Sequence, residues 1–441
     1  MASLLTVMTR RGLNLREASL LARSRVMSSP SKRIAIIGSG ISGLTCAYQL
    51  TPYFDVTLLE KNEYFGGHTQ THDVVLGDEH FPVDTGFIVF NDRTYPRFMA
   101  LLSELGCDYQ KTEMSFSLRR DRLEYNGHNL NTLFAQRRNL GSPSFLWMVK
   151  DILKFNRIAK RVDPADARPL SEFFQSAGLG RAFQSDYLLP MAAAIWSTGD
   201  EDINDFPVGM LTQFFLHHGL LDLKNRPTWF VVKDGSSSYV TRILSSLADA
   251  RSGVTVESVK RTADHVEVSS NGVRETYDEV IFACHSNEAL ALLSDPTDEE
   301  RATLSLMPYG SNRVVMHTDA RLMPREKRAW ASWNYHGGLR SDRPQLTYWM
   351  NLLEGLETET PILVTLNADD EIAPAKVLTS VTYHHPVFDA AFVAAQGRWS
   401  DISGRGRTHY CGAYWRYGFH EDGVWSAERV VGALKDRALA A

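Results

Sequence analysis

The chain has 441 residues, of which 44% are hydrophobic and 22% are charged, and this balance excludes a largely disordered protein. The formal net charge is −5, so the chain lacks the excess of basic residues that binds phosphate backbones, and no nucleic acid partner is expected. A chain of this length is longer than a domain with a single hydrophobic core usually is, so two intertwined domains are expected.

The four cysteines, Cys46, Cys107, Cys284 and Cys411, are scattered without a C-x-x-C motif or a histidine at ligand spacing. This pattern indicates reduced thiols, so we expect a cytoplasmic protein without a metal site. The sequence contains no run of about twenty uncharged apolar residues that would span a membrane. A peripheral membrane contact stays open.

Residues 1–31 carry five arginines and one acid, Glu17, among several serines and leucines. This composition resembles an organelle transit peptide. The alternative is a leader or disordered extension that precedes a second start at Met27. We favour the alternative over organelle import, because short basic leaders arise easily by composition.

A strand, a glycine turn and a helix follow one another from residue 33. Residues 34–37 form an apolar run typical of a buried parallel strand, and Gly38, Gly40 and Gly43 then give G-x-G-x-x-G. In a dinucleotide fold these glycines permit the turn, the approach of a pyrophosphate and close helix packing, in that order. Glu60 ends the next strand, where its carboxylate would accept hydrogen bonds from ribose hydroxyls and disfavour the 2′-phosphate of NADP. The flanking strands and this acid argue against an ordinary glycine-rich turn. The predicted cofactor-binding residues here are Gly38, Gly40, Ile41, Ser42, Gly43, Glu60 and Lys61.

A second glycine element follows this unit and carries a family resemblance. Gly66-Gly67-His68-Thr69 and then Asp84-Thr85-Gly86-Phe87 resemble the extended FAD-binding signature of the flavin amine oxidase and phytoene desaturase superfamily. Paired glycines let backbone amides reach an anion. The resemblance implies non-covalent FAD in place of NAD, held also by Gly66, Gly67, His68, Thr69, Thr85, Gly86 and Phe87.

A narrower resemblance extends over residues 32–441. Stretches such as DTGFIVFNDRTYP, YLLPMAAAIWST and YCGAYWRYGFHEDG are similar to a bacterial group of predicted FAD-dependent oxidoreductases and to the N-terminal half of plant cyclopropane fatty acid synthases. The resemblance implies an α/β protein with a Rossmann-like FAD-binding domain of the glutathione-reductase type and an interleaved α+β substrate domain.

The patterns divide the chain into two discontinuous domains. The FAD-binding domain is predicted from residues 32–95, 226–285 and 399–441, and the substrate domain from 96–225 and 286–398. Apolar residues at three- and four-residue spacing predict helices from Tyr95 to about Asn225, whereas aromatic-rich strands are predicted after residue 286. In the superfamily, backbone at the position of Val259 meets the adenosine side of FAD. Candidate pocket-wall residues are Trp330, Trp333, Tyr335, His336, Tyr348 and Trp349.

The C-terminal segment resembles the last FAD motif of the superfamily. Gly412 matches its glycine, but Ala413 stands where an acid is usual, which removes one expected ribityl contact. The start of the following helix supplies Glu421, Asp422 and Gly423 as predicted cofactor residues. Cys411 lies on a strand, so no covalent thioether to the flavin is expected. The loop between these motifs is predicted to pass beside the flavin, with Trp415 and Tyr417 at the pocket.

The predicted function is an FAD-dependent oxidoreductase that oxidises or desaturates a hydrophobic substrate, namely a fatty acyl chain or modified acyl lipid. No acid-base set is assigned, because a flavin itself accepts the hydride; the pocket candidates are Trp333, Tyr335, Trp415 and Tyr417. A flavin amine oxidase is the first alternative, with an aromatic cage for the amine. A non-catalytic flavin-binding partner of a lipid methyltransferase is the second.

Overall fold

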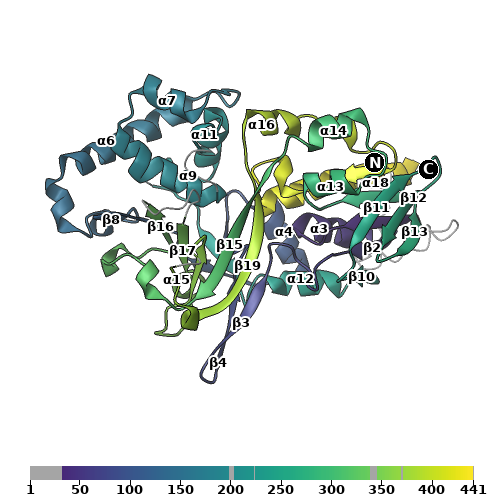
Figure 1. Cartoon of the computed structure of the whole chain (residues 1–441), viewed down its shortest axis with the longest axis horizontal. Helices are drawn as coiled ribbons and strands as arrows, with labels where there is room; N and C mark the ends of the chain where they lie inside the picture. The colour runs from purple at the N-terminus through teal and green to yellow at the C-terminus, as the bar shows by residue number, and fades with distance from the viewer. Residues whose placement is uncertain (1–31, 198–202, 223, 338–344, 369–370, 441) are drawn as a thin grey trace, which may run out of the picture.

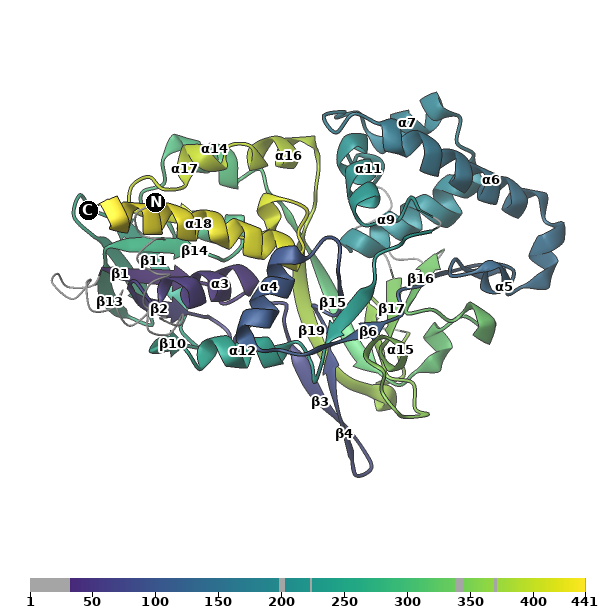
Figure 2. The same ribbon diagram turned by 180° about the vertical axis from the view of Figure 1, so that it is seen from behind.

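The computed structural model describes residues 32–197, 203–222, 224–337, 345–368 and 371–440. The predicted leader, residues 1–31, lies outside them. Figure 1 shows two lobes joined by long strands, with α3 (Ile41–Leu50) and α18 (His420–Ala440) in one lobe and α6 (Pro143–Ile158), α9 (Leu189–Trp196) and α11 (Val208–His217) in the other. Figure 2 shows the same division from behind.

A five-stranded parallel sheet forms the centre of the first lobe. Its strand order is β10 (Asp249–Arg251), β2 (Asp55–Leu59), β1 (Arg33–Ile37), β14 (Glu279–Phe282) and β20 (Thr408–Tyr410). Ile34 and Ile36 pack with α3 (Ile41–Leu50) and α18 (His420–Ala440), whereas Ala35 and Ile37 belong to the core on the opposite face. The run of four apolar residues is therefore buried on both faces, as predicted for a Rossmann-like domain.

The opposite face is covered by a small antiparallel sheet of β11 (Val256–Arg261), β12 (Val266–Ser270) and β13 (Val273–Tyr277). Further helices of this lobe are α4 (Pro96–Leu105), α12 (Ser237–Leu244), α13 (Ser286–Leu292), α14 (Asp298–Leu304), α16 (Ala390–Gln396) and α17 (Trp399–Ile402).

A seven-stranded mixed sheet forms the second lobe. Its order is β19 (Val377–Pro386), β15 (Tyr309–His317), β18 (Leu363–Leu366), β17 (Gln345–Trp349), β16 (Trp333–Gly337), β7 (Phe116–Arg120) and β8 (Leu123–Asn126). The helices of this lobe are α5 (Leu130–Leu133), α6 (Pro143–Ile158), α7 (Leu170–Ala177), α8 (Arg181–Phe183), α9 (Leu189–Trp196), α11 (Val208–His217) and α15 (Met350–Glu354). The described helices include none that is long and apolar enough to cross a membrane.

Two smaller units lie at the junction of the lobes. The strands β5 (Phe90–Asn91), β9 (Trp229–Val232) and β6 (Tyr109–Thr112) form one antiparallel sheet, and β3 (Thr71–Leu76) and β4 (Glu79–Asp84) form a hairpin. The hairpin projects from the lower edge of the molecule in Figure 1.

The structure corrects one prediction about secondary structure. Residues 109–126 were predicted within a helical stretch, but they form β6, β7 and β8. The strand β7 pairs in parallel with β16, more than two hundred residues later in the chain. Pairing with a distant strand decides the conformation of so short a segment, and local periodicity does not reveal it.

Candidate functional site

The first glycine turn leaves an open space beside the backbone of Gly40. Gly38 has φ +102°, and an added Cβ would lie 2.9 Å from the Ala283 carbonyl oxygen, while a Cβ at Gly43 would lie 1.9 Å from the Gly38 oxygen. At Gly40 a Cβ would meet nothing within 4 Å. The outer two glycines are thus required for packing, whereas the middle one borders space that a ligand can fill.

The second glycine element borders the same space. Gly66 and Gly67 have φ of +124° and +61°, and a Cβ on Gly67 would lie 3.0 Å from the Cα of Gly40. The Gly66 amide donates to the Ser39 hydroxyl oxygen at 3.1 Å. Two stretches of glycine backbone therefore lie against each other with their polar groups close together.

Two helix N-termini meet at this place. The helix α3 begins at Ile41, and the Ser42 hydroxyl donates to the Gly423 carbonyl oxygen at 3.0 Å in the first turn of α18. A Cβ at Gly423 would lie 2.6 Å from the Ile41 side chain, so this glycine permits the close contact. Because both N-termini carry partial positive charge, the arrangement suits a diphosphate.

The Glu60 carboxylate is buried at the end of β2 and already holds the first turn. It accepts hydrogen bonds from the Ser39 amide at 2.9 Å and hydroxyl at 2.6 Å, and from the Asn62 amide at 2.9 Å. The neighbouring Lys61 ammonium pairs with Glu288. This network orients the carboxylate that is predicted to bind a ribose.

The contact between the Val259 backbone and the adenosine side of FAD stays a prediction. This residue is fully buried in β11, and its carbonyl oxygen accepts from the Ser294 amide at 2.9 Å. Val254 instead lies beside the ribose acid, because its amide donates to the Glu60 carbonyl oxygen at 2.8 Å. Val254 therefore lies next to the predicted ribose site, a position that the sequence analysis did not assign.

A cluster of polar and aromatic side chains surrounds His420 at the start of α18. The Thr69 hydroxyl lies 2.5 Å from the Tyr239 hydroxyl and 3.0 Å from His420 Nε2. The Phe87 ring stacks on the His420 imidazole with centroids 3.4 Å apart. Burial lowers the pKa of His420 to about 3, so the imidazole is neutral.

A second aromatic cluster follows the paired glycines. The His68 imidazole packs edge to face against Tyr383 and His385, with centroids 4.8 and 5.1 Å away. Gly86 is required beside it, because a Cβ there would lie 2.1 Å from the His68 carbonyl oxygen, which accepts from the Phe87 amide. The Thr85 hydroxyl lies 2.9 Å from that of Tyr383. Burial, and then the neighbouring histidines, hold the pKa of His68 well below its usual range.

The cofactor residues predicted near the C-terminus make hydrogen bonds and packing contacts within the protein. The Glu421 carboxylate accepts from the amides of Arg97 and Phe98 at 3.0 Å each, so it caps α4. Asp422 accepts from the Phe419 amide, and burial raises its pKa to about 7. Gly412 accommodates the Tyr414 ring, which a Cβ would approach within 2.1 Å. Contact of these residues with FAD stays a prediction.

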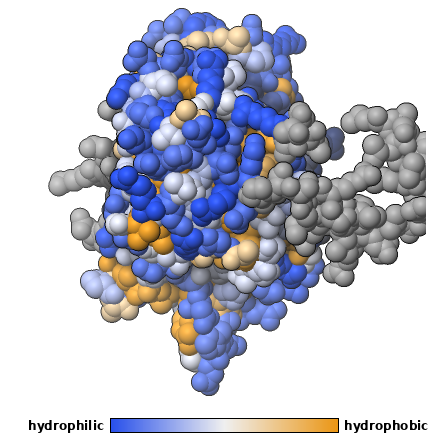
Figure 3. All heavy atoms as spheres, turned by 90° about the vertical axis from the view of Figure 1, so that its right-hand side faces the viewer, coloured by the Kyte–Doolittle hydropathy of each residue, from blue (hydrophilic) through white to orange (hydrophobic). Residues whose placement is uncertain are grey.

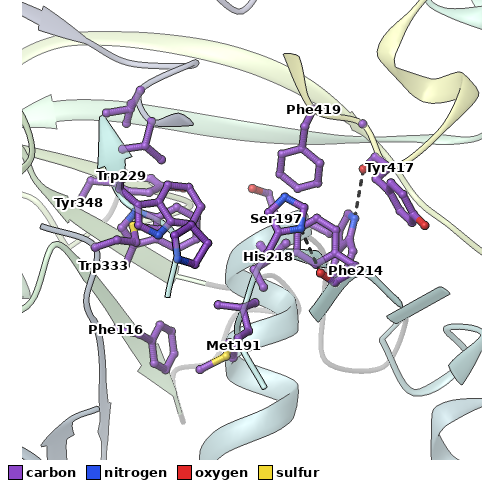
Figure 4. A pocket seen from close by; sticks show the side chains of 18 of the residues that line it. Phe116, Met191, Ser197, Phe214, His218, Trp229, Trp333, Tyr348, Tyr417 and Phe419 are labelled. Carbon is purple, nitrogen blue, oxygen red and sulfur yellow. Dashed lines mark hydrogen bonds between the residues drawn. The ribbon is translucent and has the colours of Figure 1, made fainter. Parts of the chain in front are cut away.

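An apolar cavity begins at these clusters and runs between the sheet and the helices of the second lobe. Figure 4 shows Trp229, Trp333 and Tyr348 grouped on one side, Met191 of α9 near Phe116, and His218 beside Phe214. The described lining residues include no aspartate or glutamate, and Arg226 is the one arginine or lysine among them. Other lining residues are His68, Gly86, Phe87, Tyr187, Ile195, Leu220, His385, Phe388, Tyr417, Phe419 and His420.

Two of the four predicted pocket residues line the cavity and two do not. Trp333 and Tyr417 line the cavity, whereas Tyr335 and Trp415 are buried outside its lining. Of the other wall candidates Tyr348 lines it, but Trp330 and Trp349 pack against each other at 5.2 Å. The lining residues that the sequence analysis missed, such as Met191, Trp229 and Arg226, lie on separate segments that only the fold brings together.

A sequence model of flavin-containing amine oxidoreductases matches residues 41–381. No curated protein sequence matches the chain. Similar crystal structures include a CLA-producing fatty acid isomerase from P. acnes, which is 15% identical with a TM-score of 0.65 over 92% of this chain and 99% of that one. Cyclohexylamine oxidase from Brevibacterium oxydans IH-35A is 13% identical with a TM-score of 0.67 over 92% and 99%. Putrescine oxidase bound to putrescine is 15% identical with a TM-score of 0.65 over the same shares. At these identities the likeness establishes the fold.

Proposed function

The chain belongs to the flavin-containing amine oxidoreductase family, and from that premise we propose that it oxidises or desaturates the acyl chain of a fatty acid or acyl lipid with non-covalently bound FAD. The residues fit this cofactor: open space beside Gly40, two converging helix N-termini and the buried Glu60 suit a diphosphate and a ribose. Bound FAD would supply a two-electron acceptor for hydride.

The cavity lining is the observation that carries the proposed substrate. It combines methionine, isoleucine, leucine and aromatic side chains, and its described residues include no carboxylate. An ammonium group in such a cavity would lose its hydration without gaining a counter-charge, which is costly. An alkyl chain gains free energy from the same surroundings, roughly 0.8 kcal/mol for each buried CH₂ group.

The chain's own residues would orient the substrate and exclude water. Met191 and Ile195 of α9 face the cavity together with Trp333 and Tyr348, so an alkyl chain would be held on several sides. Water exclusion protects a hydride transfer from competing reactions. The lining also includes the imidazoles of His68 and His420, which stay neutral because burial lowers their pKa, so they are weak proton acceptors.

Non-covalent attachment is supported by the state of the nearest thiols. The hydrogen bond with Cys46, whose sulfur lies 3.8 Å away, raises the pKa of the Cys411 thiol well above its usual range, and burial acts in the same direction. Burial raises the pKa of Cys284 as well. Neither thiol is available as a thiolate for attack on a flavin.

Oxidation of an amine is the second candidate function. The rings of Trp333 and Tyr348 meet at 86° with centroids 5.3 Å apart inside the cavity, and such a pair offers faces to a cation. Two of the similar structures are amine oxidases by name. The cavity suits a monoamine better than a diamine, because its described lining residues include no carboxylate to pair with a second nitrogen.

Anaerobic mixing of the FAD-loaded protein with defined substrates tests the proposal. We expect loss of the oxidised flavin absorbance with fatty acids or acyl phospholipids, together with a product that lacks two hydrogens by mass spectrometry. Bleaching by putrescine or arylalkylamines alone would favour the second candidate. Stable association with a lipid methyltransferase and no bleaching by any substrate would instead support a non-catalytic partner.

A further inference from the structure

The helix α6 exposes large apolar side chains on the face that points away from the protein. Its inner face buries Phe145, Met148 and Phe155. On the outer face Leu146, Trp147 and Leu153 are 45%, 59% and 48% exposed. A solvent-facing helix surface is normally polar, so an exposed tryptophan flanked by leucines indicates a surface with a further binding role.

Basic side chains share this outer face. At 100° per residue, Leu146, Lys150, Leu153 and Arg157 lie within a narrow arc, and Trp147 and Lys154 lie at its edge. The Lys150 ammonium lies 4.1 Å above the Trp147 ring, and the Lys154 ammonium donates to the Gly178 carbonyl oxygen. Within the described part of the chain, none of the three cations pairs with a carboxylate.

The surrounding segment has a charge opposite to that of the chain as a whole. Residues 130–161 contain one acid, Asp151, whereas the chain carries a formal net charge of −5. Their seven cations are Arg137, Arg138, Lys150, Lys154, Arg157, Lys160 and Arg161. A basic amphipathic surface with tryptophan and leucine is the combination that binds the interface of an anionic bilayer.

The same region adjoins the mouth of the cavity. Leu130 and Leu133 of α5 line a surface hollow together with His128, Trp229 and Arg226, and the last three also line the cavity. Leu130 is 75% exposed. The Phe134 ring, at the end of α5, meets the Phe145 ring of α6 at 5.7 Å, and Figure 2 shows both helices at the end of the lobe.

We propose that this surface docks the protein on membranes that contain anionic phospholipid. The docking surface comprises Leu130, Leu140, Leu146, Trp147, Lys150, Leu153, Lys154 and Arg157. The apolar side chains enter the interfacial layer and the cations pair with lipid phosphates. This inference rests on the proposed function, because docking would bring acyl chains to the mouth of the cavity, where Arg226 lies.

A second copy of the chain fits this surface less well. Two-fold contact through the same face would gather Lys150, Lys154 and Arg157 of both copies in one interface without opposing carboxylates on that face, and like charges in close proximity repel. On the opposite end of the molecule, Figure 3 shows mainly hydrophilic residues with scattered hydrophobic patches. Charge complementarity therefore favours a lipid surface over self-association.

Sedimentation with vesicles tests the docking directly. We expect the FAD-loaded protein to bind vesicles of phosphatidylcholine mixed with phosphatidylglycerol, to bind phosphatidylcholine alone far more weakly, and to dissociate as salt is added. The double variant Leu146→Ser, Trp147→Ser should lower the partition coefficient at least about tenfold. Lys150→Glu with Lys154→Glu should lower it by about fivefold or more for each charge removed.

Matched substitutions elsewhere serve as controls. Val377→Ser with Leu378→Ser removes exposed apolar side chains on β19, and Lys260→Glu removes an exposed cation on β11, so both should bind vesicles as the parent protein does. Equal binding by the α6 variants and the parent protein would overturn the proposal. So would a parent protein that ignores anionic vesicles but forms a dimer that Leu146→Ser, Trp147→Ser dissociates in analytical ultracentrifugation.

The measurement also separates docking from the proposed function. Flavin bleaching by a detergent-solubilised acyl substrate should be the same in the α6 variants and the parent protein, because the outer face of α6 does not line the cavity. If no acyl substrate reduces the flavin, the proposed function fails while vesicle binding still decides the docking. If bleaching occurs but vesicles are ignored, the docking fails alone.

Discussion

Gly40 and Gly43 lie in one turn, yet a side chain would meet different surroundings at the two positions. At Gly40 the space is open and φ is −62°, which any residue adopts, whereas at Gly43 a Cβ would collide with the Gly38 carbonyl. A substitution at the first position therefore affects what fills the open space, and one at the second affects the packing of α3 on the sheet.

We expect Gly40→Val to yield folded protein that binds little or no FAD, because the branched side chain occupies the space of the diphosphate. Flavin content after reconstitution and the circular dichroism spectrum measure the two properties. The matched variant Gly43→Ala should lower the free energy of unfolding by about 1–3 kcal/mol or more, through overpacking. Gly40→Val protein that retains a full complement of FAD would contradict the assigned cofactor site.

Arg226 is the cation at the outer end of the cavity. Its Nε donates to the Asp222 carbonyl oxygen, the guanidinium is exposed, and its charge is close enough to oppose the rise in the pKa of Tyr187, which burial raises to about 12. The exposed position limits a pairing with a substrate carboxylate to roughly 0.2–1 kcal/mol.

For Arg226→Gln we expect the KM for a free fatty acid to rise by about two- to fivefold, with kcat unchanged, because the anionic group loses its partner. The KM for the corresponding methyl ester should stay the same. Lys224→Gln, at an exposed neighbouring position that does not line the cavity, is the control. Equal effects on acid and ester would show that Arg226 does not recognise the carboxylate.

At the scale of elements, Glu421 joins two helices. It belongs to the first turn of α18, and its carboxylate accepts both amides at the start of α4. Burial raises the pKa of this carboxyl, and the α4 amides offset part of that rise. The geometry indicates a structural cap, whereas the family resemblance predicts a contact with the cofactor.

Glu421→Gln distinguishes these roles. The amide retains one acceptor oxygen but loses the charge, so as a cap it should lower the free energy of unfolding by about 0.5–2 kcal/mol and leave the FAD content unchanged. Chemical unfolding and flavin quantification provide both values. Loss of FAD at unchanged stability would restore the predicted cofactor role.

The elements differ in how far the sequence predicts them. The unit of β1, α3 and β2 was predicted correctly, because an apolar run, a glycine turn and an acid all lie within residues 33–60. The strands β7 and β8 were missed, since their partners lie far away in the chain. Trp333 lines the cavity and Trp415 does not, a difference that aromatic composition alone does not predict because it does not reveal which way a ring points.

At the scale of the whole molecule, the cavity exists only because segments from distant parts of the chain fold against each other. Its lining residues come from the segments next to β5 and β9, from α9, α11, β16 and β17, and from the loop before α18. The apolar character of these segments was visible in the sequence, but their convergence was not. The long-range pairing of β7 with β16 adds β7 and β8 to the edge of the sheet that forms one wall.

The same convergence buries several histidines, and this gives the stability of the cofactor-free protein a defined pH dependence. Burial lowers the pKa of His218, His317 and His385 to about 4, and that of His336 and His420 to about 3. Below pH about 6.5 the unfolded chain binds protons at these imidazoles and the folded chain does not, so the stability they contribute is lost as the pH falls from about 6.5 towards 4. Four buried carboxyls act in the opposite direction, because burial raises the pKa of Asp84 to about 6, that of Asp422 to about 7, and those of Glu354 and Glu421 above their usual range.

Burial also lowers the pKa of His68, His72 and His285. Among the described residues, eight lowered imidazoles therefore outweigh four raised carboxyls, so we expect the free energy of unfolding to fall as the pH decreases between about 6.5 and 4, with each net proton contributing up to about 1.4 kcal/mol per pH unit. Urea unfolding across this range measures the slope. His336→Gln should flatten it, because the amide does not titrate and its oxygen can accept from Arg119, whose guanidinium lies 3.1 Å from the His336 ring nitrogen. A slope that is identical in His336→Gln would show that this imidazole does not contribute, and a stability that rises as the pH falls would show that the buried carboxyls dominate.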